Sequence, residues 1–229
     1  DQTAADASFA LAVEHSSGRP NVTLTFAQFK LKIGDRDQAE VIVKDLIDKN
    51  PNFVPALIFR ANMLGADGLF EDALEVTEHA QRLSPMNPEI AILASQLDLN
   101  NGESEAAVSR LSKLTQRFPE FVGGHLALSK ALLANDERLR ASSSIMRVLA
   151  LDPKNIEALL MQAGLEIQQG SPEAAEENLL RVLESVPKHP IAQSLLADVY
   201  ISKNDFDQAK ELLLDLSTQQ PKNPQPLFK

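Results

Sequence analysis

The sequence predicts an all-α fold in which antiparallel helix pairs stack into a solenoid, and three observations predict it. An alanine recurs every 34 residues, a proline follows each alanine after 12 residues, and small or aliphatic residues fill further columns at the same spacing. The alanines are Ala39, Ala73, Ala107, Ala141, Ala175 and Ala209, and the prolines are Pro51, Pro85, Pro119, Pro153, Pro187 and Pro221. A fixed period of this length indicates a repeat architecture in which each repeat is one supersecondary element.

Each repeat is expected to contain two helices joined by a tight turn. The turn column holds residue types that tolerate a left-handed backbone at a helix C-terminus: Gly34, Gly68, Gly102, Asp136, Gly170 and Asn204. The first helix of the first repeat is therefore expected from about Pro20 to Ile33. In five repeats an acidic residue opens the second helix, where it suits the positive N-terminus: Asp37, Glu71, Glu105, Glu173 and Asp207. Ser171 is expected to cap its helix ahead of Pro172, and each recurring proline to end a second helix.

Three further columns predict how the helices pack. A small column lets the two helices of a repeat approach closely: Ala27, Ala61, Ser95, Ser129, Ala163 and Ala197. Two mostly aliphatic columns are expected to fill the seam to the next repeat: Val43, Thr77, Leu111, Ile145, Leu179 and Leu213, and Leu46, Ala80, Leu114, Val148, Val182 and Leu216. The six repeats therefore predict one continuous core of small and aliphatic side chains.

The composition excludes several classes of function. The formal net charge is −10, and no run of lysine and arginine interrupts it, so binding to nucleic acid or to anionic lipid is not expected. Cysteine is absent, which excludes disulfides, thiolate catalysis and cysteine-ligated metals. No stretch of 18 or more apolar residues occurs, so no direct membrane insertion is expected.

The 34-residue helix-turn-helix unit with its small, alanine and proline columns resembles the tetratricopeptide repeat. The resemblance covers six repeats, at 20–53, 54–87, 88–121, 122–155, 156–189 and 190–223. It implies a right-handed superhelix and a protein-interaction function. One family feature is missing, because the bulky aromatic residue near the start of the first helix is replaced by Thr23, Leu57, Ala91, His125, Leu159 and Gln193.

The chain ends also fit the repeat pattern. Ala5, Phe9 and Ala12 precede Ala39, Val43 and Leu46 by 34 residues, so residues 1–19 are expected to form the second helix of an earlier repeat. Residues 224–229 are expected to begin a seventh repeat. Apolar surface at both ends, near Phe9 and near Leu213 and Leu216, predicts end-to-end self-association of the chain.

No constellation for catalysis or metal binding is evident, so neither an enzyme nor a cofactor is expected. The four histidines, His15, His79, His125 and His189, fall at unrelated places in the repeat and are interpreted as surface or packing residues. Ser142, Ser143 and Ser144 form a run without a neighbouring base. Together with Gly123 and Gly124 and with the basic Arg138 and Arg140 at a helix start, this run predicts that the fourth repeat is the least stable.

The resemblance implies that the first helices line a concave, partner-binding face. One column of this face holds Leu24, Ile58, Ile92, Leu126, Leu160 and Ser194, and the next holds Gln28, Asn62, Gln96, Lys130, Gly164 and Asp198. A third holds Leu31, Gly65, Leu99, Leu133, Ile167 and Ile201. Their spacing places all three on one helix face, which suits a partner's extended peptide or amphipathic helix. The alternative is that the aliphatic residues pack neighbouring first helices together; this alternative stays open for the Leu24 column and is favoured for the Leu31 column.

The sequence thus predicts a scaffold that binds a protein partner, as part of a larger assembly. The lysines and arginines with which some family members grip a C-terminal carboxylate are missing, since Leu24, Gln28, Phe59, Asn62, Glu89 and Leu93 stand at those places. The alternative function is a structural spacer within a bacterial envelope or exopolysaccharide-export protein. A periplasmic location is favoured over a cytoplasmic one on the same resemblance.

Overall fold

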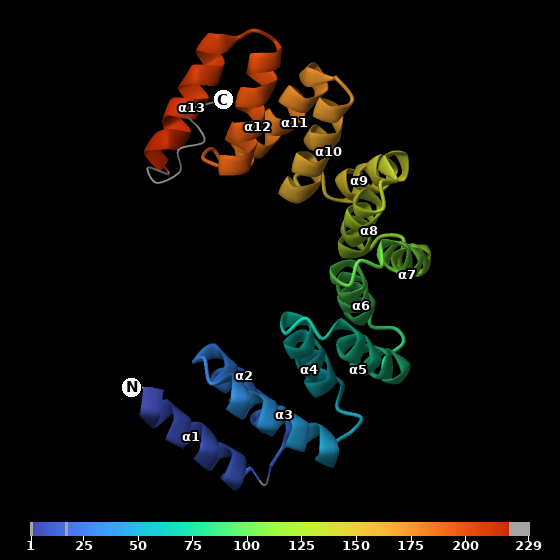
Figure 1. The fold of residues 1–229 in the computed structure, drawn as a ribbon, viewed down its shortest axis with the longest axis vertical. Coiled ribbons are helices and arrows are strands. Elements are labelled where there is room, and N and C mark those ends of the chain that lie inside the picture. The colour runs from blue at the N-terminus through green and yellow to red at the C-terminus, as the bar shows by residue number, and fades with distance from the viewer. Residues whose placement is uncertain (1, 17, 220–229) are drawn as a thin grey trace. The chain divides into compact units, whose positions relative to one another are not determined.

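The structure, a computed structural model, describes residues 2–16 and 18–219, and every regular element in this part of the chain is an α-helix (Figure 1). The helices are α1 (Gln2–His15), α2 (Pro20–Lys32), α3 (Arg36–Lys49), α4 (Val54–Ala66), α5 (Phe70–Leu83), α6 (Pro88–Asn100), α7 (Ser104–Arg117), α8 (Val122–Ala134), α9 (Arg138–Leu151), α10 (Ile156–Gln168), α11 (Pro172–Ser185), α12 (Pro190–Ser202) and α13 (Phe206–Gln219). The predicted all-α class is therefore confirmed. Residues 220–229, with the expected start of a seventh repeat, lie outside the described residues.

The chain divides into two compact blocks, which we call the N-terminal block (residues 1–114) and the C-terminal block (residues 115–229). In the N-terminal block α2 packs against α3, α4 against α5, and α4 also against α6. In the C-terminal block the packed pairs are α8 with α9, α10 with α11, and α12 with α13. Consecutive helices thus form the predicted pairs within each block, and their limits agree with the helices expected from the repeat.

The turn between the two helices of each repeat has the predicted left-handed residue. Its φ angle is +86° at Gly34, and it remains positive at the two non-glycine positions, +56° at Asp136 and +61° at Asn204. In all six turns the next N–H donates to the carbonyl five residues back, as from Asp35 to Lys30 at 2.9 Å and from Glu137 to Leu132 at 2.8 Å. This bond satisfies a terminal carbonyl of the first helix and fixes where that helix ends.

The second helices begin and end largely as predicted. Acidic residues occupy the first turn of α3, α5, α7, α11 and α13, whereas α9 has none. Asn50 and Asp152 are the C-cap residues of α3 and α9, each directly ahead of a proline. The prediction for Ser171 was only half right: it is the N-cap residue before Pro172, but its hydroxyl forms no capping hydrogen bond in the described part of the chain.

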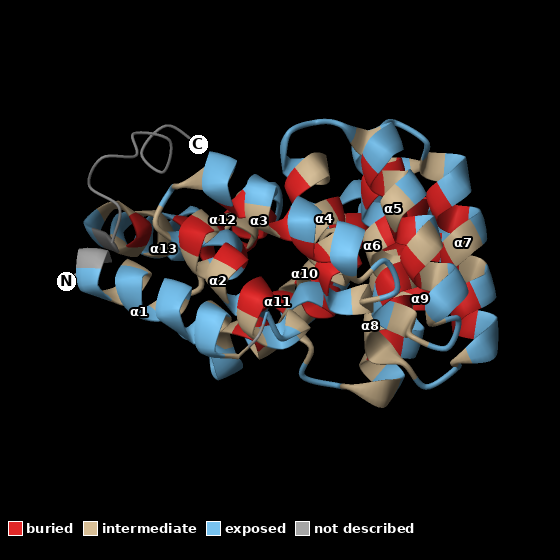
Figure 2. Ribbon diagram, turned by 90° about the horizontal axis from the view of Figure 1, so that it is seen from below, coloured by how far each residue is buried: buried red, intermediate tan, exposed pale blue. Residues whose placement is uncertain are grey.

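The core lies where neighbouring helices face each other (Figure 2). The small column and both seam columns are buried, apart from Leu213, which stays partly exposed. The polar members of these columns satisfy their hydroxyls within their own helices, since Thr77 donates to Ala73 O and Ser95 to Ala91 O, both at 2.7 Å. Small side chains and internally bonded hydroxyls thus allow close helix contact without unpaired polar groups.

Among the described residues, no helix combines the length and apolar character needed to span a bilayer.

Candidate partner-binding surfaces

In the N-terminal block, the exposed polar column is a series of side-chain amides. We call Gln28 on α2, Asn62 on α4 and Gln96 on α6 the carboxamide row; all three side chains are exposed. Asn62 Nδ2 donates to Ile58 O at 2.9 Å, and Gln96 Nε2 donates to Asn100 Oδ1 at 3.2 Å. These bonds hold two of the amides against their own helices.

The aliphatic column beside the carboxamide row is largely used in packing. Leu24 is only 7% exposed and belongs to a core cluster with Ala27 and Met63, which joins α2 to α4. Ile58 and Ile92 are half-buried, and Ile58 packs against the cluster of Leu57, Ala80 and Ile90. Little of Leu24 is therefore accessible to a ligand, and the exposed part of this face is mainly polar.

In the C-terminal block the corresponding polar column carries charge. Lys130 on α8 is exposed, and its Nζ lies 2.7 Å from Glu157 Oε1 on α10. Leu126 and Leu160 are half-buried against the clusters of Ile145 and Leu159, and Asp198 on α12 is half-buried. This face therefore differs chemically between the blocks, with amides in one and charged groups in the other.

The third column serves close packing, as the sequence favoured. Leu31, Leu133, Ile167 and Ile201 all pack against core clusters. Gly65 has another reason to be small: a Cβ atom there would lie 2.6 Å from Leu97 Cδ2. The contact brings α4 against α6, and repeat alignment alone does not reveal it.

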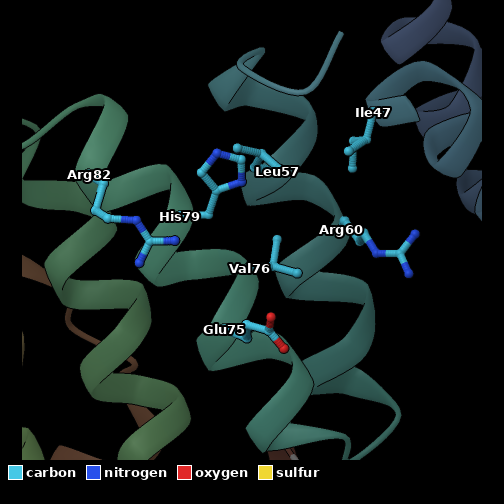
Figure 3. Close-up of a pocket in the computed structure, with 7 residues that line it drawn as sticks. All are labelled: Ile47, Leu57, Arg60, Glu75, Val76, His79 and Arg82. Carbon is cyan, nitrogen blue, oxygen red and sulfur yellow. The ribbon is translucent and has the colours of Figure 1, made fainter. Parts of the chain in front are cut away.

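A second feature, which the sequence analysis missed, is a pocket between α3, α4 and α5. We call it the basic pocket; it has a volume of about 270 Å³ and is lined by Ile47, Leu57, Arg60, Glu75, Val76, His79 and Arg82 (Figure 3). Arg60 lies two residues from Asn62 on α4, which turns it by about 200° from the carboxamide row. The pocket therefore faces the opposite side of α4.

The same location in the C-terminal block holds a pocket of different chemistry. This pocket, about 330 Å³, lies between α11, α12 and α13 and is lined by Leu180, Leu183, Leu196, Tyr200, Gln208, Glu211, Leu212 and Asp215. Burial is the main cause that raises the pKa of Tyr200, and the nearby charge of Glu176 adds to it. The hydrogen bond from Lys203 to Glu176 raises the pKa of Lys203 and joins α12 to α11.

Nothing in the described part of the chain gathers three or more metal-ligating side chains. His125 Nε2 lies 3.0 Å from Pro119 O, and His189 Nδ1 accepts from Ala192 N–H at 3.3 Å, so both rings serve local structure. Ser144, from the serine run, donates to His125 O at 2.9 Å and ties α9 to α8. These contacts position helices and do not assemble a nucleophile with a base.

A model described as the tetratricopeptide repeat matches residues 132–197 and 166–226, and no curated protein matches the chain. PilW, described as a widely conserved type IV pilus biogenesis factor, has a TM-score of 0.77 and 16% identity over 91% of this chain and 96% of its own. PilF of Pseudomonas aeruginosa has a TM-score of 0.74 and 17% identity over 91% and 95%. YrrB, described as a TPR protein with an unusual peptide-binding site, has a TM-score of 0.58 and 16% identity over 80% and 95%.

Proposed function

We propose that this chain, whose residues 132–226 match the tetratricopeptide repeat model, is a non-catalytic scaffold that binds an extended segment of a partner protein along its carboxamide row. The observation that carries the proposal is the exposure of Gln28, Asn62 and Gln96 on three successive first helices. A carboxamide offers both a donor and an acceptor, which matches the alternating N–H and C=O groups of a peptide backbone.

The spacing of the row supports an extended ligand. Packed helices lie about 8–10 Å apart, so Asn62 and Gln96, on the directly packed α4 and α6, are expected at about that separation. Three residues of a polyproline II segment span about 9 Å and complete one turn. Every third ligand residue would then present its backbone to an amide of the row.

The chemistry of the equivalent column in the C-terminal block, taken by itself, also favours a polar ligand. Lys130, paired with Glu157, and Asp198 occupy the same column in the C-terminal block. Such groups favour polar or charged side chains over a continuous apolar helix face. An extended, largely polar segment therefore fits the column better than an amphipathic helix does.

The proposal is tested by selecting peptides from a random displayed library on the intact chain and measuring their binding to Asn62→Leu and Gln96→Leu. Each substitution removes about one hydrogen-bonded group, worth about 1 kcal/mol, and should weaken binding roughly fivefold. Gln116→Leu is the matched control, since Gln116 is an exposed amide on a second helix. Selected peptides that bind all variants equally, or a library that yields no binder, would favour the spacer function instead.

A further inference from the structure

Arg60 is a charged residue at a position that packs apolar side chains in most other repeats. The corresponding residues are Phe26, Ala94, Leu128, Gln162 and Leu196. The Arg60 side chain is half-buried, and within the described residues it forms no ion pair or hydrogen bond. Removing part of a charge from water without a partner costs free energy, which a bound anionic group would recover.

His79 and Arg82 on α5 add to the positive character of the basic pocket. They are three residues apart and so share a helix face. Neither is paired with another described residue. The column of His79 holds basic residues in three other repeats, Lys113, Arg147 and Arg181, and acids in two, Asp45 and Asp215. Arg82, in contrast, is the one basic residue in its column, and the whole chain has a net charge of −10. The lining of the pocket is therefore mainly basic, although the protein as a whole is negatively charged.

The basic groups flank an apolar floor. Figure 3 shows Arg60 on one side of Leu57 and Val76, with His79 and Arg82 on the other. A volume of about 270 Å³ is just below the range of about 300–1,000 Å³ found for drug-sized ligands, so the pocket suits one or two side chains. Glu75 is the single acidic residue among those that line it.

The equivalent pocket of the C-terminal block shows that this charge does not come from the architecture. There Leu196 stands in the place of Arg60 and Asp215 in the place of His79, while Glu211 corresponds to Glu75. The same three-helix arrangement thus has an acidic rim in one block and a basic rim in the other. The two pockets should discriminate between ligands of opposite charge.

We propose that the basic pocket binds an acidic segment of a partner protein in which an aliphatic side chain lies between acidic residues. The aliphatic side chain contacts Leu57 and Val76, and the carboxylates on either side of it approach Arg60 and the pair His79 and Arg82. The site lies on the opposite side of α4 from the carboxamide row. It therefore does not depend on the proposed function, and both surfaces can be occupied together.

The test uses a fluorescein-labelled peptide, Glu-Asp-Leu-Ile-Asp-Glu, and its neutral counterpart, Gln-Asn-Leu-Ile-Asn-Gln, with binding to the full chain followed by fluorescence anisotropy. The acidic peptide should bind, and its affinity should fall between 50 and 300 mM salt, as expected for exposed charge pairs at roughly these concentrations. Arg60→Leu and His79→Asp should each weaken binding by about threefold or more, and the double variant by about tenfold. Both introduce residues that the same columns already hold at Leu196 and Asp215, so the fold should be kept, which circular dichroism checks.

Arg138→Glu controls for overall charge, because Arg138 is an exposed arginine on α9. It should change the affinity less than twofold, and so should Asn62→Leu. Equal binding of the neutral peptide, no binding of the acidic peptide up to about 1 mM, or losses no larger than with Arg138→Glu would overturn the proposal. A loss in Asn62→Leu alone would place the peptide on the carboxamide row and would overturn it too.

Discussion

The ammonium group of Lys30 lies 2.6 Å from Asp6 Oδ1, and this ion pair fastens α1 to α2. The Lys30 side chain is 5% exposed, while that of Asp6 is 38% exposed. Asp35 Oδ2 lies 3.4 Å from the same ammonium, and the ring of Phe26 is centred 5.4 Å from it. Phe9 stacks on Phe29 with 4.8 Å between ring centroids and on Phe26 with 6.1 Å, so an ion pair and two aromatic contacts hold α1 against α2.

Replacing Asp6 by asparagine should loosen α1. The buried Lys30 ammonium would keep Asp35 alone as its charged partner, and the charge-assisted bond between the helices would be lost. Amide hydrogens of residues 4–15 should then exchange roughly tenfold faster, measured by mass spectrometry. Glu14→Gln removes an exposed charge from the same helix and should leave this exchange unchanged. Equal effects of both changes would show that the aromatic contacts of Phe9, and not the ion pair, hold α1.

Alkaline pH should destabilise the protein through three groups. The pKa of Lys30 is raised above 10.5, chiefly by its hydrogen bond to Asp6, and that of Lys203 is raised above 10.5, chiefly by its bond to Glu176. The pKa of Tyr200 is raised above 10.0, chiefly by burial. Since each folded-state pKa exceeds the unfolded one, the stabilisation is complete below about pH 10 and is lost as the pH rises through the folded-state values.

The measurement is the melting temperature from about pH 9 to 12, compared between the unmodified chain and the double variant Asp6→Asn, Glu176→Gln. The unmodified chain should show the steeper fall, because the variant lacks the carboxylates that raise these pKa values. Parallel curves would mean that other groups control the alkaline unfolding.

Leu139→Glu should stabilise the fourth repeat. Leu139 is 83% exposed in the first turn of α9, where the other five repeats carry an acid. The change should add about 0.3–1 kcal/mol to the free energy of unfolding, because a negative charge suits the helix N-terminus and little burial is lost. Urea denaturation measures it. Met146→Glu adds the same charge farther along α9, at another exposed position, and should give no such gain.

The arginines of this repeat are better accommodated than their sequence suggested. They were expected to oppose the positive end of α9, but Arg138 Nε lies 2.9 Å from Asp136 Oδ1 and Arg140 pairs with Glu137. Hydrogen bonds from Asn135 and then from Arg140 lower the pKa of Glu137. Both arginines therefore have acidic partners that were not expected, and their net effect on the stability of α9 stays a prediction. Faster amide exchange in residues 122–150 than in the second and fifth repeats stays a prediction.

Two glycine-to-alanine substitutions should have different effects on the free energy of unfolding. Gly164→Ala adds a methyl group with no atom within 4 Å and should stabilise α10 by about 1 kcal/mol through helix propensity. Gly65→Ala meets Leu97 Cδ2 at 2.6 Å in a buried contact, and repacking Leu97 should cost about 1–3 kcal/mol, which cancels or exceeds the same gain. Thermal unfolding of the two variants compares them. Equal stabilisation would show that Leu97 moves aside freely.

Local backbone rules made much of the fold predictable. The left-handed turn was predicted even at Asp136 and Asn204, because aligning the repeats places them in the glycine column. The helix ends before Pro51 and Pro153 follow from the restriction that proline places on the preceding residue. The capping hydrogen bond expected from Ser171 is not formed, because such a bond depends on the side-chain rotamer as well as on residue type.

The surfaces were harder to predict. Column alignment compares one position across repeats, whereas the basic pocket joins Ile47, Leu57 and His79 from three helices of two repeats. The signal available in the sequence was Arg60, a charge in a mostly apolar column. For Leu24 the period indicated the helix face but not the degree of burial, which depends on how closely α4 packs against α2.

The same hydrogen bond closes all six turns, as from Asp35 to Lys30 and from Asp205 to Tyr200, and no insertion interrupts the 34-residue step. Deleting or duplicating one whole period would therefore join segments whose backbones already share a conformation. Gene recombination could lengthen or shorten such an array without creating a new loop. A single added residue within a helix would instead rotate everything after it by about 100° and expose its buried face.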